Sequence, residues 1–181
     1  SRGAKLYCFD AFTGRPIWNI SGWYQNPHAI SGGYLIASDA QYTGYTYCFG
    51  KGATETSVSV STDVISHGST VLVKGSVMDL SSAQVNTPAI SDEDMTTWMN
   101  YIHMQDATLL NNPPTPRGVP VKLWTLDPNR NRVEIGTVTT DGTGLFKKLW
   151  TPEVPGEYTV YASFEGSESY WRSLGTTAVG V

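Results

Sequence analysis

One segment of the chain carries oxygen-bearing side chains at the spacing of a calcium-binding loop. Asp127, Asn129 and Asn131 alternate along the sequence, as in the first half of such a loop. The second half departs from the pattern, because Arg132 stands where glycine is required and Val138 stands where the bidentate glutamate is required. A proline-containing segment between two strands is also typical of a hairpin turn. We therefore expect a turn and no metal site, with the three alternating residues as the only candidate ligands.

Other residues that could support catalysis do not occur in recognisable combinations. His28, His67 and His103 are far apart in the sequence and lack metal-ligand spacing. The sequence contains no Gly-x-Ser-x-Gly nucleophile motif and no phosphate-binding loop. The acidic run at 92–94 is explained by the start of a helix, where carboxylates are favourable. We therefore expect no enzymatic activity and no cofactor.

Three residues are candidates for covalent modification. Asn19 is the acceptor of the sequon Asn19-Ile-Ser21 and is a candidate for N-glycosylation. Cys8 and Cys48 lie 40 residues apart, at equivalent positions of a repeat. We expect both to be small buried apolar residues, and the alternative is a disulfide between them in an oxidising compartment.

The composition limits the classes of partner. The chain has 181 residues, of which 40% are hydrophobic, which is enough for a packed core. Charged residues make up 15% and the net charge is −4, which argues against nucleic acid as a partner. No apolar stretch approaches the ~20 residues that a membrane-spanning helix needs, so we expect no membrane span within the chain.

The N-terminal part contains a repeat. The segment Leu6–Asp10 (LYCFD) returns as Thr46–Gly50 (TYCFG), a period typical of β-propeller blades of four strands each. A propeller closes with about four to eight blades, and little more than one is present here. We therefore expect residues 1–50 to be an incomplete propeller segment, followed by a linker at 51–55. The expected strands are 5–9, 15–20, 28–31, 34–38 and 45–49.

The remaining residues, 56–181, predict an antiparallel β-sandwich. Seven segments alternate in polarity or are rich in β-branched and aromatic residues, and well-marked turns separate them. These expected strands are 57–62, 69–79, 119–126, 132–139, 144–150, 157–164 and 176–181.

A long connection at about 82–116 interrupts this β pattern and predicts one amphipathic helix over 91–105. Ser91 can cap the helix, and the apolar residues that follow recur at helical spacing. We expect their side chains to pack on the side of the sandwich, and the alternative is a partner-facing helix. The apolar face consists of Met95, Trp98, Met99 and Ile102.

Two segments resemble known families. The pattern from Leu6 through Thr13-Gly14 to Trp18 resembles the PQQ-like β-propeller repeat, and this resemblance implies that Trp18 docks one blade on the next. The segment around Tyr158 resembles bacterial and archaeal Ig-like domains, in which Tyr158 would be the tyrosine-corner residue. Together the two segments resemble archaeal cell-surface proteins that combine such repeats with a C-terminal Ig-like domain. This resemblance implies an extracellular location.

These observations favour a structural or assembly module of a surface protein. An incomplete blade has unpaired strand edges, so self-assembly into a filament or lattice by strand complementation is expected. The expected partners are other copies of the chain or the remainder of a longer precursor. The alternative function is adhesion to carbohydrates or surfaces through Trp23, Tyr24, Tyr42 and Tyr45, with surface glycans as partners. A fragment of a quinone- or metal-dependent enzyme is a third possibility, which rests on the propeller resemblance alone.

Overall fold

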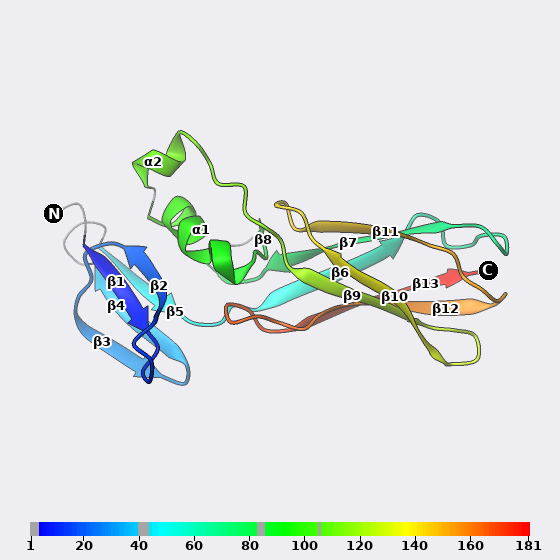
Figure 1. Cartoon of the computed structure of the whole chain (residues 1–181), viewed down its shortest axis with the longest axis horizontal. Helices are drawn as coiled ribbons and strands as arrows, with labels where there is room; N and C mark the ends of the chain where they lie inside the picture. The colour runs from blue at the N-terminus through cyan, green and yellow to red at the C-terminus, as the bar shows by residue number, and fades with distance from the viewer. Residues whose placement is uncertain (1–3, 40–43, 83–85, 105) are drawn as a thin grey trace. The chain divides into compact units, whose positions relative to one another are not determined.

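The structure is a computed structural model that describes residues 4–39, 44–82, 86–104 and 106–181, with the side chains of 25–28 left out. The described part is mainly β, with several antiparallel sheets and short helices (Figure 1). This confirms the predicted mainly β class.

The chain divides into two compact units. The first consists of Ser1–Lys51 together with Asp92–Pro116, and the second consists of Gly52–Ser91 together with Arg117–Val181. The helical connection that was expected to belong to the sandwich therefore clusters with the N-terminal segment. The second unit is continuous in space although the helical segment interrupts it in sequence.

The first unit contains two small antiparallel sheets. Strands β1 (Lys5–Phe9) and β2 (Pro16–Ser21) form a two-stranded sheet. Strands β3 (Gln25–Ser31), β4 (Tyr34–Asp39) and β5 (Tyr45–Phe49) form a three-stranded sheet in that order (Figure 1). All five strands occur where the sequence predicts a strand, although β3 begins at Gln25, three residues earlier than expected.

The turn between β1 and β2 is closed by Asp10. Its Oδ1 atom accepts hydrogen bonds from the backbone N–H of Phe12 at 3.1 Å and from the backbone N–H and hydroxyl of Thr13, both at 2.7 Å. The Thr13 hydroxyl has the largest part in lowering the pKa of Asp10. Gly14 has φ +70° and donates its N–H to the Asp10 carbonyl, so this position favours glycine.

The helical segment is shorter and more broken than the sequence predicts. A 3₁₀ turn, η1 (Asp92–Asp94), leads into α1 (Met95–Ile102), and α2 (Ala107–Leu110) follows. Asp94 stands at the N-cap position of α1. The buried Ser91 hydroxyl makes no hydrogen bond to any described residue, so the expected Ser91 cap is wrong.

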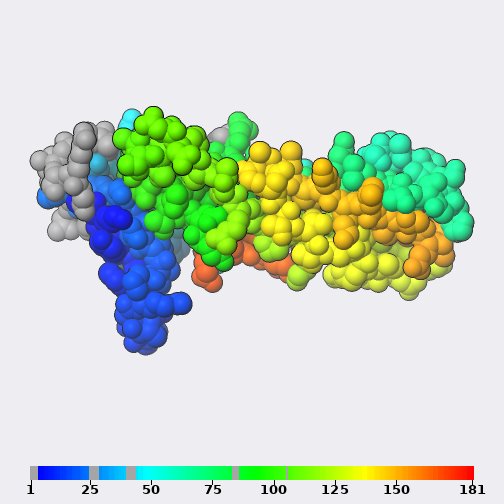
Figure 2. All heavy atoms as spheres, turned by 45° about the horizontal axis from the view of Figure 1, so that its top comes forward, coloured from blue at the N-terminus to red at the C-terminus, as the bar shows by residue number. Residues whose placement is uncertain are grey.

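Helix α1 packs against β2 within the first unit (Figures 1 and 2). Trp98 and Asn100 are its buried residues. The Asn100 side chain accepts a hydrogen bond from the backbone N–H of Ser21 at 3.0 Å. The helix was expected to pack on the sandwich, and the element that it contacts here is β2 of the first unit. The pattern shows that one face is apolar, but it does not show which sheet covers that face.

The second unit contains two antiparallel sheets that share one core. One sheet has the order β11-β7-β6, with β8 paired to β7, and the other has the order β10-β9-β12-β13. The first sheet consists of β6 (Thr54–Val60), β7 (Val71–Asp79), β8 (Thr87–Pro88) and β11 (Leu145–Trp150). The second consists of β9 (Pro120–Leu126), β10 (Arg132–Thr139), β12 (Glu157–Phe164) and β13 (Ser173–Gly180).

Strict alternation along the strands builds the core of this unit. In β12 every second residue is buried, as a strand with one buried face requires. Strands β7 and β9 contribute alternating valine and leucine side chains from the two sheets. The fully buried side chains include Val71, Val73, Val77, Val121, Leu123, Val160 and Phe164.

The two sheets meet along β6 and β13, whose edges cover one another. Isolated parallel bridges lie at both ends of this pair of strands. Between them, the hydroxyl of Thr54 donates to that of Ser173 at 2.8 Å, and the hydroxyls of Thr56 and Ser173 are 2.6 Å apart. A Cβ on Gly175 would come within 2.5 Å of the Thr56 carbonyl oxygen, so the close approach depends on this glycine. Residues 52–55 of the expected linker belong to this unit, and Gly52 donates its N–H to the Ser169 carbonyl.

Candidate assembly surface

Aromatic side chains pack the two sheets of the first unit against one another. The Trp18 ring of β2 stacks on the Phe49 ring of β5, with centroids 5.7 Å apart and planes 29° apart. The ring of Tyr24, between β2 and β3, presents an edge contact to Tyr47 at 5.7 Å and to Phe49 at 5.9 Å. Trp18 therefore lies between the two sheets.

Tyr24 belongs to this interior cluster. Its hydroxyl is 3.5 Å from the Ser21 carbonyl and 3.6 Å from the Met104 sulfur. Burial is the main cause that raises the pKa of Tyr24, and the charges of Tyr47 and Asp39 add to it. The ring is therefore neutral at physiological pH and packs on its neighbours, which leaves Trp23 and Tyr45 as the more exposed sugar-stacking candidates. Tyr42 lies outside the described residues.

The outward faces of the same two sheets carry exposed apolar side chains. Tyr7 and Phe9 of β1 are 53% and 54% exposed, and their rings stack with centroids 5.8 Å apart. On the other sheet, Ile36 of β4 and Cys48 of β5 are paired in register and both exposed. Further exposed apolar side chains of this unit are Phe12, Ile17, Ile30 and Tyr34. Clustered apolar residues at a surface are typical of an interaction site.

The edges of these sheets are open among the described residues. Strand β1 pairs with β2 alone, and β5 pairs with β4 alone. Strand β5 carries no charged residue, so it lacks the charge that commonly protects an edge from pairing. The edges of β6 and β13 in the second unit, by contrast, cover one another.

The two cysteines are both free thiols. Cys8 is half-buried and lies opposite Trp18 in the β1–β2 ladder. Cys48 is exposed on β5. The alternative of a disulfide between them is therefore not what the structure shows, and the expected burial is wrong for Cys48. The repeat fixes the position of each thiol in its strand but not what lies beside that strand.

Asn19 of the sequon lies in β2 and is half-buried. Its Oδ1 atom accepts a hydrogen bond from the Lys5 ammonium group at 2.9 Å. Asn19 is paired in register with Tyr7. Since directly paired residues share a face, a glycan at Asn19 and a partner over Tyr7 would compete for the same surface. Glycosylation at this position stays a prediction.

The candidate calcium ligands form a hydrogen-bonded turn. Oδ1 of Asp127 accepts from the Asn131 backbone N–H at 2.7 Å, and Oδ2 accepts from the Asn131 side-chain amide at 2.9 Å. This side-chain bond is the main cause that lowers the pKa of Asp127. Both oxygens of Asp127 therefore close the β9–β10 turn. Among the described residues, no group of three or more His, Cys, Asp or Glu side chains could hold a metal ion.

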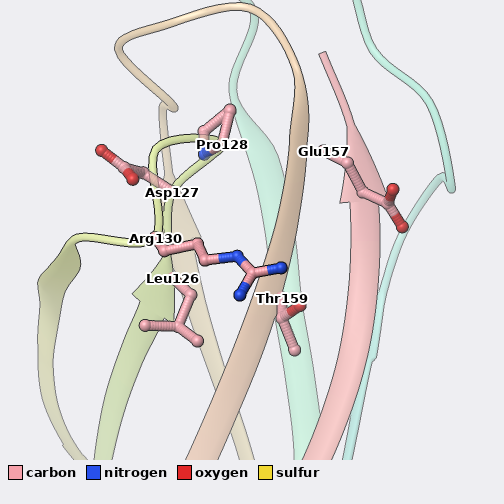
Figure 3. Close-up of a pocket in the computed structure, with 6 residues that line it drawn as sticks. All are labelled: Leu126, Asp127, Pro128, Arg130, Glu157 and Thr159. Atoms are coloured by element: carbon pink, nitrogen blue, oxygen red, sulfur yellow. The ribbon is translucent and has the colours of Figure 1, made fainter.

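An open depression of about 490 Å³ lies beside this turn. Figure 3 shows the Arg130 side chain extending across it, while the Asp127 carboxylate points away. Arg130 has φ +64°, an uncommon backbone conformation for a residue with a side chain. The lining residues are Leu126, Asp127, Pro128, Arg130, Glu157 and Thr159.

Two aspartates in turns of the second unit, Asp127 and Asp141, are expected to make its stability sensitive to acid. Hydrogen bonds, chiefly from Asn131 to Asp127 and from Thr143 to Asp141, lower both pKa values below the ordinary 3.8. When the pKa of a carboxyl group is lower in the folded state than in the unfolded state, its ionised form stabilises the fold at pH values above the unfolded-state pKa. This contribution is lost as the pH falls through the folded-state pKa. We therefore expect the contribution of these two turns to stability to be constant above about pH 5 and to fall below about pH 4.

Urea midpoints measured against pH test this expectation. The Asp127→Asn/Asp141→Asn double variant keeps an oxygen acceptor at each turn but cannot titrate there. It should show a smaller loss of stability between pH 5 and pH 2 than the unchanged chain. An identical pH profile for the two proteins would contradict the assignment of the acid sensitivity to these turns.

The Tyr158 hydroxyl joins the start of β12 to the preceding loop by hydrogen bonds. Its hydroxyl donates to the Val154 carbonyl at 2.8 Å and accepts from the Val154 N–H at 3.0 Å. The ring is buried and presents an edge contact to Trp150, with centroids 5.3 Å apart. The role of Tyr158 in this unit is therefore structural.

The exposed apolar faces of the first unit are the feature that motif searching missed. The signal was present in Leu6–Phe9, where apolar residues occupy both faces of one strand, as in a strand covered on both sides.

No helix in the described part of the chain is long and apolar enough to cross a membrane. No protein-family model matches the chain, and no curated protein is significantly similar to it.

Proposed function

We propose that the chain is a non-catalytic assembly module of an extracellular surface protein. In this proposal the first unit is an incomplete β-propeller and the second is an Ig-like sandwich. The module associates with other copies of itself, or with the remainder of a longer precursor, by β-strand complementation. The extracellular location rests on the resemblance of the sequence to archaeal surface proteins.

The strand arrangement of the first unit supports the propeller assignment. A blade has four antiparallel strands, and this unit has a two-stranded and a three-stranded sheet. The repeat aligns β1 with β5, so a counterpart of β2 would follow β5 and counterparts of β3 and β4 would precede β1. The stacking of Trp18 on Phe49 supports the role of Trp18 in docking one blade on the next.

Three features of the second unit support the Ig-like assignment. Its seven longer strands form two antiparallel sheets with a shared core. The neighbouring strands β9 and β12 lie at the centre of one sheet, and β7 lies between β11 and β6 in the other. The Tyr158 hydroxyl bonds back to Val154 at the start of β12, as in a tyrosine corner.

The single observation that carries the assembly proposal is the apolar outward surface of the first unit, with its open edges. Tyr7, Phe9 and Ile36 face outward where a stacked blade would cover them. A contact between unlike edges or faces of two copies is heterologous, and such contacts propagate into filaments unless the rotation closes a ring. Filament or lattice growth is therefore the expected form of self-assembly.

Light scattering after size exclusion, over a range of protein concentrations, tests this proposal. We expect the unchanged chain to form oligomers whose mass grows with concentration. Tyr7→Lys should abolish them because it removes the central ring of the outward face of β1 and adds a second charge beside that of Lys5. Leu149→Lys should leave them unchanged, because Leu149 is 67% exposed in β11 of the second unit, outside this surface. A chain that stays monomeric at every concentration would refute self-assembly.

A further inference from the structure

We infer that the free edge of β5 is an acceptor site for one extended strand with the sequence pattern of β2. The occupant is an uncharged segment of the type Pro-Ile-Trp-Asn-Ile-Ser, supplied by another copy of the repeat. This inference rests on the proposed function and names the partner of the assembly surface. Two observations define the site: the repeat and the direction of the backbone groups.

The repeat gives the register of the incoming strand. In the β1–β2 ladder, Tyr7 is opposite Asn19 and Cys8 is opposite Trp18. The repeat places Tyr47 where Tyr7 stands in β1, and Cys48 where Cys8 stands. A strand of the β2 pattern would therefore place its tryptophan opposite Cys48 and its asparagine opposite Tyr47.

Backbone hydrogen bonds identify the edge that β2 occupies on β1. The Ala4 carbonyl accepts from the N–H of Gly22, and the Asp10 N–H donates to the carbonyl of Arg15. Backbone groups of alternate residues in a strand point to the same edge. The even-numbered residues of β1, Cys8 among them, therefore direct their backbone groups to β2.

The corresponding edge of β5 is the free one. Gly44 donates its N–H to the Asp39 carbonyl, as Gly14 does to Asp10 in the first hairpin. In the first hairpin Arg15 follows the glycine, and its carbonyl accepts a hydrogen bond from the N–H of Asp10. In the second hairpin Tyr45 follows Gly44 and is paired with Asp39. Residues 45, 47 and 49 therefore direct their backbone groups to β4. Residues 46 and 48, the counterparts of 6 and 8, direct theirs to the free edge.

The two cysteines lie on opposite faces of their sheets, since burial alternates in opposite phase along β1 and β5. Cys8 is half-buried and Cys48 is exposed, although they occupy the same position of the repeat. Strand β2 lies beside Cys8, and among the described residues no strand lies beside Cys48 on the corresponding edge.

The chemistry of the site also fits this occupant. Strands β5 and β2 both lack charged residues, so pairing them would bury no charge. Cys48 is paired with the exposed Ile36, which gives the incoming tryptophan an apolar surface to cover.

Disulfide trapping with synthetic peptides tests the register and the face together. Two peptides of the sequence 15–22 are used with the full chain in a glutathione redox buffer, one carrying Trp18→Cys and the other Asn19→Cys. Directly opposite residues in an antiparallel pair lie within the Cα range of a disulfide, whereas the neighbouring position points to the other face. Mass spectrometry should find the Trp18→Cys peptide on Cys48 at least about tenfold more than the Asn19→Cys peptide.

Chain variants provide the controls. Cys8→Ser should keep the selective product, and Cys48→Ser should lose it. Equal linkage by both peptides, preferential linkage to Cys8 or no linkage at all would overturn the inference. Light scattering on the unchanged chain separates the two proposals. Assembly without selective linkage overturns the β5 site alone, and selective linkage without assembly overturns self-assembly alone.

Discussion

Leu123→Ala is expected to lower the free energy of unfolding of the second unit by about 2–5 kcal/mol, because it leaves a cavity in a close-packed core. Leu123 is 0% exposed and lies in β9, between β10 and β12. The surrounding side chains come from two sheets that the hydrogen-bonded ladders hold in place, so they can fill the cavity only in part. Urea denaturation followed by far-UV circular dichroism measures the effect.

Leu149→Ala is the matched control for this prediction. Leu149 lies in β11 of the same unit, and it is 67% exposed. The same change of side chain should therefore alter stability by no more than about 0.5 kcal/mol. If the two variants lose equal stability, the core does not lie between these sheets as described.

The strands of the second unit could be predicted because each carries its own signal. In β12, Tyr158, Val160, Ala162 and Phe164 alternate with less buried residues, and alternation of this kind depends on local geometry alone. The turn at Asp127 was predictable for the same reason, since aspartate bonds to backbone groups a few residues further along.

The partner of each apolar face could not be predicted in this way. Helix α1 meets β2 through a hydrogen bond between Asn100 and Ser21, which are 79 residues apart in the sequence. Periodicity identifies the apolar face of a helix, but it carries no information about a contact at that separation. The difference between Cys8 and Cys48 has the same origin, because burial depends on which face of the strand another sheet covers.

Trp18→Ala is expected to destabilise the first unit by about 2–4 kcal/mol, somewhat less than the loss of a fully buried tryptophan. The Trp18 ring supplies the stacking contact between the two sheets. Its loss should speed amide hydrogen exchange in residues 4–39 and 44–51. Exchange in residues 117–181 should stay unchanged, because they belong to the other unit.

Trp18→Phe separates the aromatic contact from the rest of the side chain. A phenyl ring can still stack on Phe49 and cover Cys8, so this variant should keep most of the protection and the capacity to assemble. Trp18→Ala should lose both, because the outward surface of Tyr7 and Phe9 depends on a sheet that the tryptophan holds in place. Assembly by Trp18→Ala at the level of the unchanged chain would mean that the packing of the two sheets is not required for the contact between subunits.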